Sequence, residues 1–109
     1  MINIEDFEKV DMRAGLIVEV QDFPRAKNPS YKARIDFGPE IGEKWTAMQA
    51  TNYRKESLIG MQVIGVVNLA PRNIAGFISE VLTLGVPQAG GTLSLLTPSL
   101  PARVGTKVY

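Results

Sequence analysis

One cation, Arg72, lies in a turn-rich stretch between two apolar runs of the chain. The runs, Val63–Leu69 and Val81–Leu84, are rich in Val, Ile and Leu, which favour buried β-strands. Pro71 cannot donate a backbone hydrogen bond, so we expect the first strand to end before it. Rigid strands on both sides would hold the stretch in place, which suits a binding site. Its other polar side chains belong to Asn68, Asn73, Ser79 and Glu80.

Charge is distributed unevenly along a chain whose net charge is only +1. Residues 1–22 carry most of their charge as carboxylates, whereas residues 23–35 carry four cations and no acid. From Ser57 to the C-terminus, the single acid is Glu80. If the fold brings the two acid-poor regions together, a basic face results. The alternative is that these charges are scattered and only solvate the surface.

Several kinds of catalytic chemistry lack the residues they need. The chain has no cysteine and no histidine, which removes the thiolate nucleophile, the commonest general base and the commonest metal ligand. It has neither a P-loop nor the glycine pattern of a dinucleotide-binding unit. We therefore expect no catalysis, no metal and no cofactor.

The first half of the chain is expected to contain one short helix and three strands. Asn3, with an acid three residues later, is typical of a helix start, and the strands are expected at Leu16–Phe23, Tyr31–Phe37 and Lys44–Ala50. The second of these strands has the clearest alternation of apolar and polar residues. Asp11 and Arg13, just before the first strand, suggest an ion pair or a turn bond.

The second half adds helical turns at Tyr53–Leu58, the two apolar runs, and short strands at Leu93–Leu96 and Gly105–Val108. Glycines near or within strands, Gly15 and Gly65, indicate bends or bulges in a curved wall. Five strands with a small helix between the third and fourth predict a single all-β domain over residues 1–109. We interpret it as a five-stranded OB-fold Greek-key barrel with an N-terminal helix and C-terminal extension strands.

An OB-fold binds oligonucleotides on the face of its second and third strands and with the loops joining strands 1–2 and 4–5. The cations of the acid-poor regions before residue 100 would all lie there, where they could neutralise phosphates. They are Arg25, Lys27, Lys32, Arg34 and Arg72.

The motif Asn68-Leu69-x-Pro71-Arg72, followed by Gly76 and Ser79-Glu80, resembles the core motif of the tRNA-binding OB domains. These occur as free-standing proteins and as appendages of some aminoacyl-tRNA synthetases. The stretches Phe23-Pro24-x-Ala26 and Asp36-Phe37-Gly38-x-Glu40-Ile41-Gly42 are similar to the CsaA-type branch, whose members are small homodimers described as export-related chaperones. One departure is Asn73, at a position that is often basic in the tRNA-binding relatives.

The resemblance covers nearly the whole chain and implies a non-catalytic, cytoplasmic homodimer that binds tRNA and does not insert into a membrane. Together with the charge pattern it predicts an RNA-binding set of ten residues. These are Lys32, Arg34, Gln49, Thr51, Asn68, Pro71, Arg72, Gly76, Ser79 and Glu80.

The alternative hypothesis is an export-related chaperone that binds unfolded polypeptides or preproteins in the same or a neighbouring groove. Ile74, Phe77 and Ile78 are apolar residues of the predicted loop, and their exposure would create an adaptable apolar surface. Phe77 could instead tuck into the mouth of the barrel, and Trp45 could either stack on a base or join the core.

Overall fold

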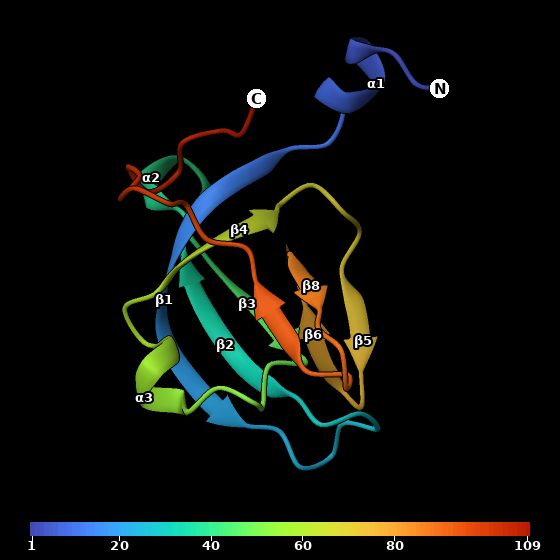
Figure 1. The fold of residues 1–109 in the computed structure, drawn as a ribbon, viewed down its shortest axis with the longest axis vertical. Coiled ribbons are helices and arrows are strands. Elements are labelled where there is room, and N and C mark those ends of the chain that lie inside the picture. Colours follow the sequence, from blue (N-terminus) through green and yellow to red (C-terminus); the bar gives the residue numbers. More distant parts are fainter.

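A computed structural model describes all 109 residues, and its main feature is a five-stranded antiparallel sheet that curls nearly into a barrel (Figure 1). The predicted OB-like, mostly β architecture is confirmed. The strands follow the order β3-β2-β1-β4-β7 across the sheet. Their bounds are β1 Met12–Asp22, β2 Tyr31–Asp36, β3 Glu43–Met48, β4 Gln62–Val66 and β7 Leu82–Thr83.

Three short helices and two hairpins complete the fold. The helices are α1 Ile4–Glu8, α2 Gly38–Ile41 and α3 Lys55–Leu58, and none is long and apolar enough to cross a membrane. One hairpin joins β5 Arg72–Ile74 to β6 Phe77–Ser79, and the other joins β8 Gly85–Pro87 to β9 Leu93–Leu95. The predicted start of α1 is confirmed, because Asn3 and Asp6 form a capping box.

Two of the predicted connections and strands differ from the structure. The stretch expected to be a loop contains the β5–β6 hairpin, whose turn at Ala75 and Gly76 takes positive φ angles. The expected last strand at Gly105–Val108 is reduced to a bridge between Lys107 and Arg13. Pro98 and Pro101 keep the preceding segment extended and unpaired, so this tail has little length left for a ladder.

The long strand β1 joins the two halves of the barrel. Its first residues pair with β4, and its later residues pair with β2. Within the pairing with β2, the register shifts between Ile17 and Glu19, an irregularity that sharpens the local twist. The predicted contact between Asp11 and Arg13, just before and at the start of β1, is confirmed by a separation of 2.6 Å.

The structure has no bulge at Gly65, because β4 pairs with β1 in continuous register. A Cβ atom on Gly65 would lie 2.8 Å from Cζ of Phe37, and one on Gly15 would lie 2.7 Å from Cε1 of the same ring. Both distances are too short for a normal contact. These glycines are therefore required by close packing against Phe37.

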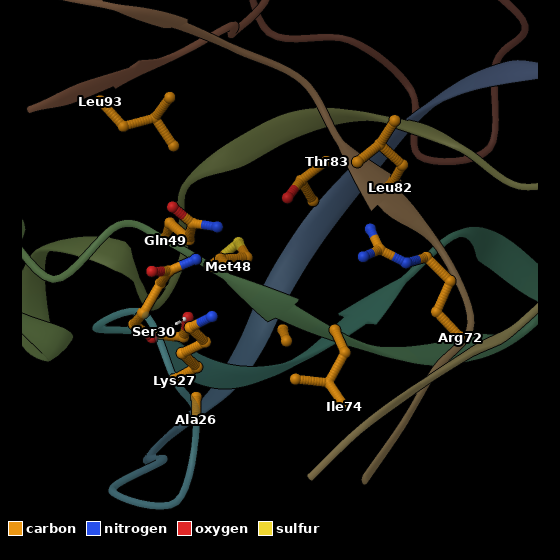
Figure 2. A pocket seen from close by; sticks show the side chains of 12 residues that line it. Ala26, Lys27, Ser30, Met48, Gln49, Arg72, Ile74, Leu82, Thr83 and Leu93 are labelled. Carbon is orange, nitrogen blue, oxygen red and sulfur yellow. Dashed lines mark hydrogen bonds between the residues drawn. The ribbon is translucent and has the colours of Figure 1, made fainter. Parts of the chain in front are cut away.

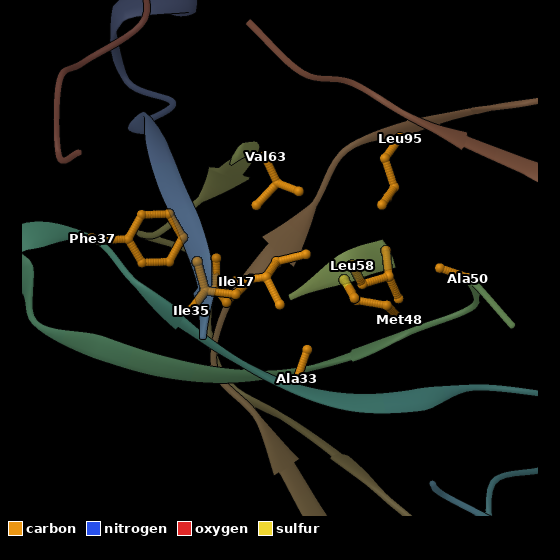
Figure 3. Close-up of a cluster of buried hydrophobic side chains, with 10 residues drawn as sticks. Ile17, Ala33, Ile35, Phe37, Met48, Ala50, Leu58, Val63 and Leu95 are labelled. Carbon is orange, nitrogen blue, oxygen red and sulfur yellow. The ribbon is translucent and has the colours of Figure 1, made fainter. Parts of the chain in front are cut away.

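The core lies inside the curled sheet, beneath α3 and the β8–β9 hairpin (Figure 3). The alternation predicted for β2 is confirmed, because Ala33, Ile35 and Phe37 are completely buried. Tyr31 packs at the margin of this core and donates a hydrogen bond from its hydroxyl to the Tyr53 carbonyl at 2.8 Å.

Candidate nucleic-acid interface

A pocket of about 310 Å³ opens between the loop after β1, the end of β3 and strands β5 and β7 (Figure 2). Lys27 comes from the loop and Arg72 from the β5–β6 hairpin, and Figure 2 shows them on opposite sides of the opening. The lining includes apolar side chains and no carboxylate. Neither cation takes part in an ion pair, so both charges can interact with a bound anion.

A second hollow lies on the other side of the same hairpin, where Arg25 and Lys32 approach its tip at Gly76 and Phe77. The ammonium nitrogen of Lys32 lies 4.8 Å from the ring centre of Phe23 and 5.0 Å from that of Phe77. These are cation–π distances, and they leave the ammonium group unpaired with any carboxylate. Arg25, Lys27, Lys32 and Arg72 thus surround the β5–β6 hairpin without internal counter-ions.

Phe77 is the centre of an aromatic cluster on the outer side of the barrel. Its ring centre lies 5.4 Å from Phe23 and 6.3 Å from Trp45, both in edge-to-face arrangements. Phe77 and Trp45 are both half-buried, and neither belongs to the core cluster. The cluster packs the hairpin against β3 and the loop after β1, and this packing holds the tip of the hairpin in place.

Arg34 differs from the four unpaired cations. Its guanidinium lies 3.0 Å from a carboxylate oxygen of Glu19 and 2.6 Å from one of Glu43. The hydrogen bond with Glu43, and then that with Glu19, raises the pKa of Arg34. Two carboxylates balance this one charge, so Arg34 has less capacity for a phosphate than the sequence suggests.

Ser79 and Glu80 close the barrel. The Ser79 hydroxyl accepts a hydrogen bond from the Ala47 amide at 3.1 Å, and a Glu80 carboxylate oxygen accepts one from the Trp45 amide at 3.0 Å. The Glu80 amide donates to the Trp45 carbonyl at 2.8 Å. These bonds join the end of β6 to β3 where no regular ladder forms, and we call this junction the seam.

Asn68 connects the N-terminal segment to the end of β4. Its side-chain oxygen accepts from the Asp11 amide at 3.0 Å, and its side-chain nitrogen donates to the Lys9 carbonyl at 2.8 Å. Both ends of the amide are therefore engaged within the chain. This geometry gives Asn68 a structural role beside its predicted contact with RNA.

The remaining predicted residues lie at the surface with different relations to the pocket. The Gln49 side chain lines the pocket and forms no hydrogen bond within the chain. Thr51 is exposed and does not line the pocket. Pro71 is exposed just before β5, and Gly76 supplies the turn at a φ of 88°. Of the apolar residues in the alternative hypothesis, Ile74 lines the pocket and Ile78 is 49% exposed.

Sequence reasoning missed Leu82 and Thr83, which form β7 and line the pocket. Both belong to a run expected to be buried, but β7 is a short edge strand whose first residue is 46% exposed. Val81 and Leu82 are both apolar, so the sequence contains no alternation by which the exposed Leu82 could have been recognised. The structure has no group of three or more side chains that could hold a metal ion.

Comparison with known proteins matches residues 12–107 to the family described as "Putative tRNA binding domain". The CsaA chaperone protein from Picrophilus torridus has a similar structure, with a TM-score of 0.95, 48% identity and 100% of both chains covered. The CsaA chaperone from Bacillus anthracis has a similar structure with a TM-score of 0.91 and 44% identity. The similarity covers 100% of this chain and 99% of that chain. The methionine–tRNA ligase of Methanocaldococcus jannaschii is 35% identical over 98% of this chain, which spans only 16% of that ligase.

Proposed function

The chain belongs to the tRNA-binding domain family, in its CsaA-type branch, and from this premise we propose that it binds tRNA through the face around the β5–β6 hairpin. The observation that supports this most strongly is the group of four cations without internal counter-ions: Arg25, Lys27, Lys32 and Arg72. Phosphates that bind there release counterions from the RNA, so the affinity should depend steeply on salt.

In this proposal the protein is a non-catalytic homodimer in the cytoplasm. The chain has no His and no Cys, and binding to phosphate needs only positioned cations and hydrogen-bond donors. Dimerisation is supported by exposed apolar residues on and before α1, which projects from the barrel (Figure 1). Two copies of a modest cationic face would also give avidity for one RNA.

A direct experiment titrates the protein with bulk tRNA at 50 and 200 mM salt. We expect measurable binding whose affinity falls by at least tenfold over this range, because several phosphate contacts are involved. Binding that is absent at low salt, or that does not respond to salt, would overturn the proposal.

A second candidate function is the holding of unfolded, export-bound polypeptides. It is supported by exposed apolar side chains beside the same face, at Leu69, Ile78 and Leu82, each about half exposed. It is also supported by the names of the two CsaA neighbours, which are called chaperones. Apolar contacts with a polypeptide should change little or strengthen as salt rises, so the same pair of salt concentrations separates the two activities.

A further inference from the structure

The pocket in Figure 2 has the lining that a single flat heterocycle needs. Ile74 and Leu82 provide apolar walls, and polar side chains lie around the opening. At about 310 Å³ its volume is at the small end of the range of ligand sites, which is about 300–1,000 Å³. It therefore suits one nucleotide and is too confined for a paired helix.

Four polar side chains of this pocket are available for a ligand. Lys27, Gln49, Thr83 and Arg72 line it, and none of their side chains forms a hydrogen bond or ion pair within the chain. Figure 2 shows the two cations on opposite sides, with the Gln49 amide and the Thr83 hydroxyl along the edge between them. An amide offers both a donor and an acceptor, which matches the edge of a base that is not already paired.

We propose that this pocket takes one unpaired nucleotide of a bound RNA. The base lies against Ile74 and Leu82, its edge meets Gln49 and Thr83, and Lys27 and Arg72 bind the phosphates on either side. This inference rests on the proposed RNA-binding function and makes it more specific. Because bases in a duplex are stacked and their edges are paired, the pocket selects single-stranded loops or ends over helices.

The test compares an RNA hairpin, whose loop carries one 2-aminopurine, with a blunt RNA duplex that has the same number of phosphates. We expect the hairpin to bind about tenfold more tightly, as contact with one base allows. We also expect the 2-aminopurine fluorescence to rise on binding, because the base leaves its stacked neighbours for an aliphatic pocket.

Two variants address the pocket in different ways. Ala47→Leu fills its floor, and Gln49→Ala removes an exposed amide without touching the core. Each should bring hairpin affinity down toward that of the duplex and abolish the fluorescence change. Gln88→Ala, at the exposed turn between β8 and β9, is the matched control for Gln49→Ala and should keep the preference.

The outcomes separate the two proposals. Equal, salt-sensitive binding of hairpin and duplex would overturn the nucleotide pocket and leave the RNA-binding function standing. Retention of the hairpin preference in both pocket variants would overturn the pocket in the same way. Failure of the wild-type protein to bind either RNA would overturn the proposed function together with the inference.

Discussion

Arg34 and Arg72 carry the same charge but have different surroundings. Arg34 donates to both Glu19 and Glu43, whereas Arg72 is exposed and has no carboxylate partner. A phosphate that approaches Arg34 must compete with two charge-assisted hydrogen bonds, and one that approaches Arg72 competes only with water. The two arginines therefore differ in their expected contribution to RNA binding, although both belong to the predicted binding set.

Asp11 provides a prediction about pH. The hydrogen bond from Arg13 lowers the pKa of Asp11 below its ordinary value of 3.8. Because the folded-state pKa is lower than the unfolded one, this carboxylate's contribution to stability is complete above about pH 4 and is lost as the pH falls through the folded-state pKa. The stability difference between wild type and Asp11→Asn should thus be constant from pH 5 to 7 and shrink below pH 4.

Urea unfolding at several pH values measures that difference. Asp22→Asn is the control, because its carboxylate is 71% exposed and pairs only with Lys55 at the surface, where ion pairs contribute little to stability. A stability difference for Asp11→Asn that stays the same at pH 3 would show that the ion pair with Arg13 does not contribute in this way.

At the scale of elements, the seam determines where the β5–β6 hairpin lies relative to β3. Glu80→Ala would leave the half-buried Trp45 amide without its acceptor, at a cost of about 1–3 kcal/mol. Glu80→Gln keeps an acceptor oxygen and should cost much less. Because Trp45 is the only tryptophan, its fluorescence reports on the seam directly.

We therefore expect a shifted emission spectrum and lower stability in Glu80→Ala, and a near-native spectrum in Glu80→Gln. Glu80→Gln should also bind tRNA slightly more tightly, because a negative charge near the cations is removed. Equal stability of the two variants would contradict the role of Glu80 in the seam.

Alternation in β2 was sufficient to predict a buried face, because each second side chain must point into the core. The hairpin around Arg72 could not be predicted in the same way. Its strands have three residues each, and their position depends on the contact between Phe77, Phe23 and Trp45, which are distant in sequence. Ser79 bonds across the seam, and Asn68 bonds to the segment before β1. Neither role could be predicted, because the partners of both side chains are distant in sequence.

At the scale of the whole molecule, two apolar residues at and just before the start of α1 are largely uncovered. Ile2 is 73% exposed and Ile4 is 63% exposed, although the helix is well capped. The side chain of Asn68 binds the segment that follows this helix, so the direction in which the helix projects from the barrel is defined. A second copy of the chain would cover these residues in the proposed homodimer.

Ile4→Glu should therefore convert a dimer to a monomer, as measured by sedimentation equilibrium. Glutamate suits the first turn of a helix, so the helix itself should persist. Val86→Glu, at an exposed position of β8, is the matched control and should remain dimeric. A wild-type protein that is monomeric at micromolar concentration would contradict the dimer.

The most direct test of the central proposal is the salt dependence of tRNA binding in Arg72→Ala. Removal of one phosphate contact should weaken binding and reduce the slope of log affinity against log salt by about 1. Arg103→Ala removes an exposed cation from the opposite region, beside α2, and should leave the slope unchanged. If Arg72→Ala binds tRNA with the wild-type affinity and slope, RNA does not bind at the β5–β6 hairpin, and the account of this face is wrong.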